Sequence, residues 1–260
     1  MPYTLITGAT GGLGKEFSGE CAVRGMNLFL TGRSSEKLEK LKNEIKSMND
    51  NIDVQIFPCA LDDENSRKEM FTYAKQNGYK FERLINVAGA DIQKAFSEYT
   101  QEKLVFQARV NFEAAVSVTK FVIESRTDKL QILTVSSLCG TVPMPYFALY
   151  SATKAALINF FTAMRYEISN ADITVLAPGS VPTREDIKKD IKLQGITGRL
   201  SSKNPSFVVK TALDGLNKNK RLVIPGFYNK LVYFAEKISP LKLQMKIIAK
   251  KFCKKEKDAF

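Results

Sequence analysis

Three side chains that could transfer a proton lie close together in the second half of the sequence. Tyr150 and Lys154 are four residues apart, and Ser137 lies thirteen residues before the tyrosine. Residues four apart share one face of a helix, so the Lys154 ammonium would lie beside the Tyr150 phenol and favour its ionised form. A free phenol has a pKa of about 10, and a neighbouring cation together with a hydroxyl is a route to a lower value. The trio predicts acid–base chemistry by tyrosine.

The sequence contains no histidine, and this narrows the chemistry further. Without histidine there is no Ser-His-Asp triad, no Cys-His dyad and no histidine-ligated metal, and we predict no metal site. The simpler alternative is that Tyr150 is a helix-surface tyrosine beside a lysine and Ser137 a hydroxyl at a strand end. The cysteines have no paired spacing, which is typical of reduced, structural thiols; they are Cys21, Cys59, Cys139 and Cys253.

The elements that must position these side chains follow an α/β pattern. A chain of 260 residues is long enough for one large domain, and its first half alternates short apolar runs with longer segments of helical periodicity. This alternation predicts βαβ units and a doubly wound, mainly parallel sheet of seven strands flanked by helices. The strands are expected at Tyr3–Ile6, Met26–Leu30, Val54–Phe57, Arg83–Val87, Leu130–Val135, Ile173–Leu176 and Arg221–Ile224.

A glycine-rich run follows the first predicted strand and opens a helix. Glycine lets the backbone approach a pyrophosphate closely, and the N–H groups at a helix start favour its negative charge. An ordinary strand-to-helix turn is the alternative, although the position after the very first strand favours a nucleotide site. The candidate residues are Gly8, Thr10, Gly11, Gly12, Leu13 and Gly14.

The turn after the second predicted strand reads Thr31-Gly32-Arg33-Ser34 and contains no acidic residue. An acidic residue here binds the ribose 2′-hydroxyl of NAD, whereas a basic residue accommodates the 2′-phosphate of NADP. Arg33, with Lys15, therefore predicts a preference for NADP(H) over NAD(H), because a guanidinium pairs well with phosphate. A solvated surface arginine is the alternative.

Together these residues resemble the short-chain dehydrogenase/reductase family in its compact form, over about residues 3 to 226. The five motifs occur in order. They are Thr7 to Gly14, which matches TGxxxGxG; Asn86-Val87-Ala88-Gly89, which is similar to NNAG; Ser137 at the usual distance from the tyrosine; Tyr150 to Lys154, which matches YxxxK; and Pro178 to Thr183, which matches PGxVxT. The resemblance implies a Rossmann-like fold.

The resemblance also implies a role for each matched residue. Tyr150 would donate a proton to a substrate carbonyl oxygen while NADPH delivers hydride to its carbon, and Ser137 would hydrogen-bond the same oxygen. Lys154 would hold the nicotinamide ribose and keep the phenol acidic. Asn111 would anchor a water relay, although a helix polar residue without such a role is the alternative. Cofactor contacts are implied for Asn86, Ala88, Gly89, Tyr150, Lys154, Pro178, Gly179, Val181 and Thr183.

Two positions depart from the family pattern. Ala60 stands where relatives commonly have an aspartate that reaches the adenine amino group, so adenine binding is expected to rest on the Leu61 backbone or on Asp62. Val87 replaces the second asparagine of NNAG, and we expect it to pack into the sheet. Neither substitution touches the proton-transfer group.

The predicted function is an NADP(H)-dependent oxidoreductase that interconverts a carbonyl and an alcohol on a fairly apolar, lipid-like or steroid-like substrate. Met144, Tyr146 and Phe147 precede the tyrosine and would supply apolar walls. A cofactor-binding sensor or scaffold with little turnover is the alternative. A sugar-nucleotide epimerase is disfavoured because those relatives are longer and space their glycines differently.

The chain is predicted to form a catalytic domain at residues 1–228 and a basic, amphipathic extension of the same domain at 229–260. Within the domain, the polar segment from Ser180 to Lys203 is expected to be a mobile substrate lid with a short helix, at about residues 180–205. Between Asn229 and Lys257 there are nine lysines against two glutamates, which accounts for much of the net charge of +12.

The extension carries a predicted apolar helical face of Leu241, Met245, Ile248 and Phe252. Two interpretations remain open: a helix docked on the domain, or peripheral attachment to an anionic membrane. Nucleic acid binding is not expected, because no recognised motif accompanies the charge. We see no room for a leader and no apolar run of about 18 residues, so a cytoplasmic location is expected, with possible contact at the inner face of the membrane. The resemblance implies a homodimer or homotetramer.

Overall fold

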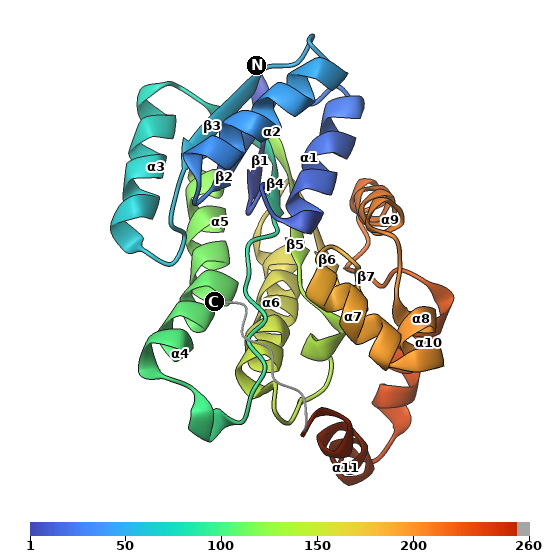
Figure 1. Cartoon of the computed structure of the whole chain (residues 1–260). Helices are drawn as coiled ribbons and strands as arrows, with labels where there is room; N and C mark the ends of the chain where they lie inside the picture. The colour runs from blue at the N-terminus through green and yellow to red at the C-terminus, as the bar shows by residue number, and fades with distance from the viewer. Residues whose placement is uncertain (254–260) are drawn as a thin grey trace.

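A computed structural model describes residues 1–253, and one parallel sheet forms its centre (Figure 1). Seven strands lie in the order β3-β2-β1-β4-β5-β6-β7, and every neighbouring pair is parallel. The strand order reverses between β1 and β4, where doubly wound sheets bind their ligands. The predicted fold class is confirmed. The strands are β1 (Pro2–Thr7), β2 (Leu28–Gly32), β3 (Val54–Pro58), β4 (Lys80–Asn86), β5 (Arg126–Val135), β6 (Ala171–Leu176) and β7 (Leu222–Val223).

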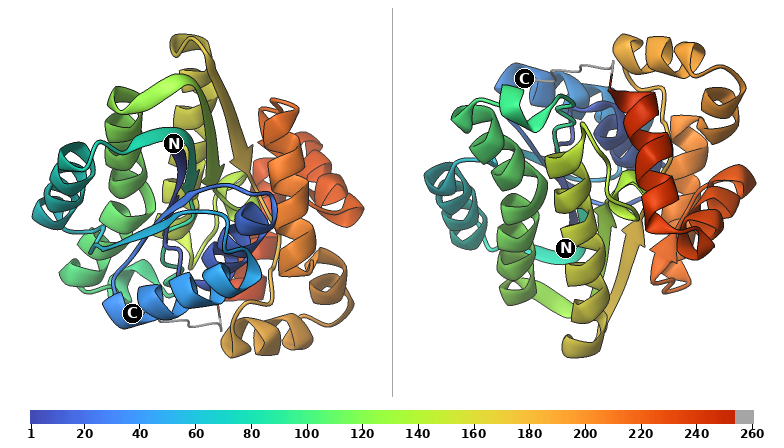
Figure 2. Two further views of the ribbon diagram at one scale, coloured as in Figure 1. Left: turned by 90° about the horizontal axis from the view of Figure 1, so that it is seen from above. Right: turned by 90° about the horizontal axis from the view of Figure 1, so that it is seen from below.

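Helices cover both faces of this sheet, as the two views of Figure 2 show. Successive strand residues point to opposite faces, so Leu5 packs in one core and Ile6 in the other. The core with Ile6 lies under α1 (Gly12–Val23), α2 (Ser35–Met48) and α9 (Pro205–Asn217). The core with Leu5 lies under α3 (Glu64–Gln76), α5 (Ala114–Glu124) and α6 (Ala148–Glu167). A short α4 (Gln101–Ala108) precedes α5.

All seven predicted strands are present, although β4 begins three residues and β5 four residues earlier than predicted, and β2 begins two residues later. Met26 was expected to begin the second strand, but β2 begins at Leu28. The Met26 amide instead donates to the Cys21 carbonyl, 3.1 Å away, and Gly25 has a φ of +75°. Met26 therefore still belongs to the C-terminal turn of α1, because a left-handed glycine there closes the helix.

The predicted lid segment contains two helices where one short helix was expected. These are α7 (Glu185–Leu193) and α8 (Gly195–Ser201). Gly195 has a φ of +59°, which breaks the helical path between them. The chain then continues into α9 on the face of the sheet that α1 covers.

Two helices end the described chain: α10 (Phe227–Ile238) and α11 (Leu241–Phe252). Met245, Ile248 and Phe252 of α11 pack against the buried cluster of Val142, Met144 and Phe147, whereas Leu241 is exposed. Three of the four residues of the predicted apolar face thus dock on the domain. Within residues 1–253, every helix is too short or too polar to cross a membrane.

Candidate active site

Tyr150 and Ser137 come together where β5 ends and α6 begins. Tyr150 lies in the first turn of α6, and Ser137 caps the short 3-10 helix at Leu138–Gly140 with its hydroxyl, which accepts from the Cys139 amide at 3.1 Å. The Ser137 hydroxyl lies close enough to the Tyr150 phenol to lower the pKa of that phenol by hydrogen bonding. Phe147 stacks on the tyrosine ring with 4.2 Å between the ring centroids. The stacked ring holds the tyrosine side chain in place.

Lys154 lies one turn farther along α6 and is buried. Its Nζ donates to the Val135 carbonyl at 2.9 Å and lies 5.7 Å from the centroid of the Tyr150 ring. Burial lowers the pKa of Lys154 from 10.5 to about 8, because the ammonium loses its hydration. The residue is therefore a cation that releases its proton unusually easily.

The Tyr150 phenol does not show the lowered pKa that the sequence suggested. Burial raises the pKa of Tyr150 above its ordinary value, and the hydrogen bond from Ser137 opposes this shift without overcoming it. Lys154 gives little help because its ammonium is directed at the Val135 carbonyl. The phenol of this structure is accordingly a protonated acid at neutral pH.

Asn111 joins this cluster from the opposite helix. It is fully buried in a π-helical turn, Arg109–Glu113, between α4 and α5. Its Nδ2 donates to the Ala90 carbonyl at 2.9 Å and to Thr153 Oγ1 at 3.1 Å, and its Oδ1 accepts from the Ala90 amide at 2.6 Å. A Cβ on Gly89 would lie 3.1 Å from Asn111 Oδ1 and 3.3 Å from Lys154 Nζ. Asn111 and Lys154 thus meet at Gly89, at the end of β4.

The glycine-rich loop has a shape that only small residues allow. Gly8 has a φ of +63°, and a Cβ there would lie 2.9 Å from the Ala88 Cα. A Cβ on Gly14 would lie 2.1 Å from the Gly8 carbonyl oxygen, and one on Gly12 would lie 2.3 Å from the Thr183 Cβ. The loop between β1 and α1 therefore packs against both the NVAG segment and the PGSVPT segment.

The start of α1 has the chemistry of an anion site. Gly11 precedes the helix without a side-chain cap, and the first turn holds no acidic residue. Gly11 and Gly12 are both exposed. Helix N–H groups without a capping side chain attract phosphate through their partial positive charge. These residues fit the pyrophosphate of a dinucleotide.

Arg33 lies next to the same loop. Gly32, its neighbour, lies beside Thr10, since an added Cβ would be 3.1 Å from Thr10 Oγ1. The Arg33 side chain is exposed, and among residues 1–253 it has no ion-pair partner. A cation is therefore available at the end of β2 for a charged group bound along the loop.

The remaining predicted contacts have mixed surroundings. Leu61 is buried, and its carbonyl accepts from the buried Arg67. Asn86 is turned into the sheet, where its Nδ2 donates to Thr119 at 3.2 Å and to Thr134 at 3.3 Å. The segment from Pro178 to Thr183 follows β6. The Pro178 carbonyl accepts from the Leu138 amide, and Gly179 packs on Ser201 and Asn229. Val181 is buried, and Thr183 faces Gly12.

An ion pair near Tyr150 was missed by the sequence analysis. Arg184, at the start of α7, contacts Asp91 in the loop after β4, with 2.9 Å between the charged atoms. Asp91 contributes to the raised pKa of Tyr150, and Arg184 opposes it. The pair ties the lid to the loop that carries Gly89. No local pattern could reveal it, because the two residues lie 93 positions apart.

Asn229 and the α11 side chains were also missed as neighbours of the site. Asn229 is fully buried, and its Nδ2 donates to the Pro225 carbonyl at 2.8 Å and to the Ser201 carbonyl at 3.0 Å, so it joins α10 to α8. Tyr150 packs against the same cluster, Val142, Met144 and Phe147, as Met245, Ile248 and Phe252. The C-terminal helix therefore packs on the same apolar cluster as Tyr150.

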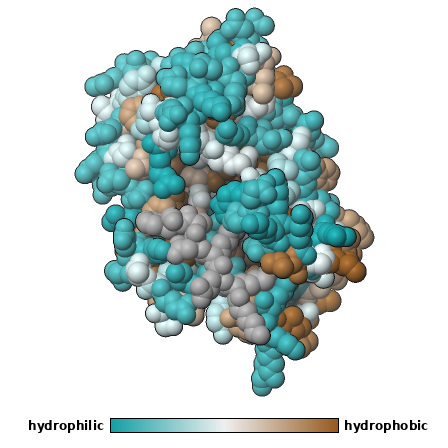
Figure 3. Space-filling model, viewed as in Figure 1, coloured by the Kyte–Doolittle hydropathy of each residue, from teal (hydrophilic) through white to brown (hydrophobic). Residues whose placement is uncertain are grey.

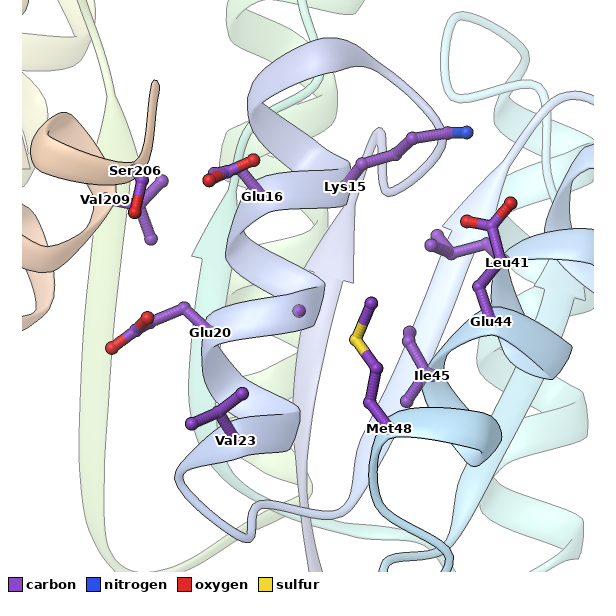
Figure 4. Close-up of a pocket in the computed structure, with 11 residues that line it drawn as sticks. Lys15, Glu16, Glu20, Val23, Leu41, Glu44, Ile45, Met48, Ser206 and Val209 are labelled. Carbon is purple, nitrogen blue, oxygen red and sulfur yellow. The ribbon is translucent and has the colours of Figure 1, made fainter. Parts of the chain in front are cut away.

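A separate hollow of about 330 Å³ lies between α1, α2 and α9 (Figure 4). Glu16, Glu20 and Glu44 line it together with apolar residues, and Lys15 extends from α1 toward α2. It contains none of the four proton-transfer candidates. Its acidic lining also does not suit a phosphate, so the candidate active site is the crevice at the carboxyl ends of β1, β4 and β5.

Known proteins resemble this chain in sequence along most of its length. The family model described as short chain dehydrogenase matches residues 2–193. The chain belongs to the short-chain dehydrogenase family. Its members are oxidoreductases that use nicotinamide cofactors. The 11-beta-hydroxysteroid dehydrogenase-like 2 of Arabidopsis thaliana is 28% identical over 91% of this chain and 77% of that protein.

A second relative, the very-long-chain 3-oxoacyl-CoA reductase of Kluyveromyces lactis, is 33% identical over 66% of this chain, which spans about half (52%) of that protein. Solved structures share the fold. A chain from a study of 7beta-hydroxysteroid dehydrogenase stereoselectivity superposes with a TM-score of 0.84 at 23% identity, over 95% of this chain and 96% of that one. L-sorbose reductase from Gluconobacter frateurii, solved with NADPH and L-sorbose, superposes with a TM-score of 0.77 at 18% identity, over 86% of this chain and 95% of that one.

Proposed function

We propose that this oxidoreductase reduces the carbonyl group of an apolar substrate with NADPH, or runs the reverse reaction with NADP⁺, and that Tyr150 transfers the proton. The observation that carries the proposal is the meeting of Lys154 and Asn111 at Gly89, with Tyr150 one turn before Lys154 on α6 and Ser137 beside its phenol. Four polar groups with these chemistries converge at the edge of the sheet where doubly wound folds bind ligands.

The bound dinucleotide supplies hydride to the carbonyl carbon. Tyr150 holds the proton for the carbonyl oxygen, and its raised pKa keeps the phenol loaded at neutral pH. Ser137 donates a hydrogen bond to the same oxygen and orients the substrate. Lys154 would hold the nicotinamide ribose. Asn111 holds the loop after β4 against α6 and would anchor a water relay. An alcohol is the product.

The preference for NADP(H) rests on Arg33, which would contact the 2′-phosphate, and on the absence of an acid in the turn after β2. The pyrophosphate would lie at the start of α1, beside Gly12. Leu61 or Asp62 would bind the adenine, and Thr183 would bind the nicotinamide carboxamide. The other proposed cofactor contacts are Gly8, Thr10, Leu13, Gly14, Asn86, Ala88, Gly89, Tyr150, Lys154, Pro178, Gly179 and Val181.

An apolar substrate is favoured by the walls around Tyr150. Phe147 stacks on the Tyr150 ring, and Met245, Ile248 and Phe252 of α11 pack on the same cluster of Val142, Met144 and Phe147. The names of the relatives, hydroxysteroid dehydrogenases and very-long-chain 3-oxoacyl-CoA reductases, support the same class. We propose a sterol-like or long-chain carbonyl compound, covered by the lid at about residues 180–205.

We further propose a single catalytic domain over residues 1–228 with a helical extension at 229–260, assembled as a homodimer or homotetramer. The helices that carry Asn111 and Tyr150 would form the contact between subunits. We also propose a cytoplasmic location with peripheral contact at the inner face of the membrane.

The test is a screen of ketones, aldehydes and sterols with NADPH and with NADH, followed at the nicotinamide absorbance. The proposal predicts turnover of apolar carbonyl compounds, faster with NADPH. A chain that binds dinucleotide and turns over none of these compounds would instead act as a cofactor sensor or scaffold.

A further inference from the structure

The outward side of α10 carries an unusual apolar stripe. Phe227, Leu231, Phe234 and Ile238 are each between 50% and 76% exposed. Their spacing of four, three and four residues keeps them on one helical face. A surface helix normally turns its apolar face toward the core. In α10 this apolar face points to the solvent instead.

The stripe continues onto neighbouring helices. Leu243 and Ile247 of α11 are more than half exposed, on the side of that helix opposite to Met245 and Ile248. Ile196 and Leu200 of α8, which packs beside α10, are exposed as well. Figure 3 shows hydrophobic residues gathered over α8 and α10 and toward α11. We call Phe227, Leu231, Phe234, Ile238, Leu243 and Ile247 the outer face.

The charges around the outer face have one sign. The exposed charged side chains of residues 227–253 are all lysines, at positions 230, 237, 242, 246, 250 and 251. The one acid of this range, Glu236, is turned inward and accepts from Thr141 Oγ1 at 2.7 Å. Apolar side chains rimmed by lysines complement a bilayer with anionic headgroups, since the lysine stems lie along the apolar region and the ammonium groups reach the phosphates.

The sequence had suggested a different surface for such contact. Met245, Ile248 and Phe252 were expected to face the membrane if the extension bound lipid, but they pack against Val142, Met144 and Phe147. The side of α11 that remains for a partner is the one with Leu243, Ile247 and the lysines. One side of α11 thus packs on the domain, and its opposite side forms part of the outer face.

We propose that the outer face docks on an anionic lipid bilayer and holds the molecule at its surface. A bilayer fits better than a second copy of this chain, because two copies of a surface with six lysines and no exposed acid would repel each other. Docking brings the apolar wall of α11 to the lipid, where a water-insoluble carbonyl compound is concentrated. This deepens the proposed function, while lipid binding itself does not require catalysis.

The experiment is sedimentation of the full chain with vesicles of phosphatidylcholine alone and of equal parts phosphatidylcholine and phosphatidylserine. The chain should bind the anionic vesicles, and added salt should weaken binding. The double variant Leu231→Glu/Phe234→Glu should bind the anionic vesicles more than about tenfold more weakly. The two apolar side chains that would enter the bilayer are replaced by negative charges, which anionic lipid repels. Val23→Glu, at an equally exposed apolar residue of α1, should bind like the wild type.

Failure to sediment with anionic vesicles, or equal binding by the double variant, would overturn the inference. Light scattering could instead show that the double variant has a lower molar mass than the wild type, while both bind vesicles equally. That result would mean that the outer face contacts a second copy of this chain and not lipid. Activity on a water-soluble ketone without vesicles separates the two proposals. Turnover without lipid binding would refute only the proposed docking surface. Lipid binding without turnover would refute only the proposed function.

Discussion

The crevice around Tyr150 and the surface of α10 and α11 are built on opposite principles. In the crevice, polar side chains are buried and hydrogen bonded, as Asn111 is to the Ala90 carbonyl and to the Thr153 hydroxyl. On the outer face, large apolar side chains such as Phe234 lie exposed beside lysines. Buried polar groups must be satisfied locally, whereas exposed apolar groups are stabilised by a partner. The first region therefore holds its geometry alone, and the second is completed by something outside the chain.

The glycine loop gives the largest expected effect on the crevice. Gly14→Ala would place a Cβ 2.1 Å from the Gly8 carbonyl oxygen, so the loop must move away from its phosphate-binding shape. We expect NADPH binding about 100-fold weaker or worse, which corresponds to about 3 kcal/mol. Titration of NADPH fluorescence measures it. Gly19→Ala is the matched control in the same helix, because nothing lies within 4 Å of its Cβ; equal binding by both variants would refute the structural role of Gly14.

Lys154 gives the next effect, on stability as a function of pH. The pKa of Lys154 is 10.5 unfolded and about 8 in the fold, so below pH 8 the folded protein carries the full penalty of a buried charge. That penalty disappears as the pH rises from 8 to 10.5. The free energy of unfolding of Lys154→Met should therefore exceed that of the wild type by up to about 3 kcal/mol at pH 7, and this advantage should vanish near pH 10.5. The lost hydrogen bond to the Val135 carbonyl lowers the stability of the variant by the same amount at every pH.

Urea unfolding of both proteins at pH 7 and at pH 10 measures this difference. A stability difference that stays the same at the two pH values would show that Lys154 is not held as a destabilised cation.

Arg33 tests the cofactor side of the crevice. Arg33→Glu would set a carboxylate against the 2′-phosphate, so we expect KM for NADPH to rise about tenfold or more while KM for NADH changes little. Lys37→Glu, with the same charge change on the exposed side of the following helix, is the control. Equal effects of both variants would mean that Arg33 acts through general charge and not through a phosphate contact.

The ion pair between Arg184 and Asp91 gives the smallest expected effect. Both residues are partly exposed, and such pairs contribute roughly 0.2–1 kcal/mol. Arg184→Gln should change the free energy of unfolding by less than about 1 kcal/mol and should raise KM for substrate a fewfold, because the lid is less firmly tied to the loop after β4. Loss of all turnover would give Arg184 a direct part in the reaction instead.

The parts of the molecule that could be predicted are those with a local signal. The glycine loop after β1 and the spacing from Tyr150 to Lys154 are written in short stretches, so the strand-to-helix turn and the shared helix face followed from residue order alone. The stripe on α10 also had a local signal, with apolar residues at spacings of four, three and four, but the sequence does not show whether such a stripe faces the core or the solvent.

Other features depend on contacts across long stretches of chain. Arg184 meets Asp91 from 93 positions away, and Phe252 reaches the cluster beside Tyr150 from more than 100. The pKa of Tyr150 was expected to fall because Lys154 is near in sequence, yet it rises because burial dominates. Burial is a property of the assembled fold, and a spacing of four residues carries no information about it.

The most direct test of the central claim is the turnover of Tyr150→Phe beside its NADPH affinity. The account predicts NADPH binding within about twofold of the wild type and a fall in kcat of about 100-fold or more, because the substitution removes the phenolic hydroxyl that donates the proton and leaves the other cofactor contacts unchanged. Tyr166→Phe, at an exposed tyrosine of the same helix, should keep full activity. Turnover of Tyr150→Phe near the wild-type rate would contradict the role of this phenol as the proton donor.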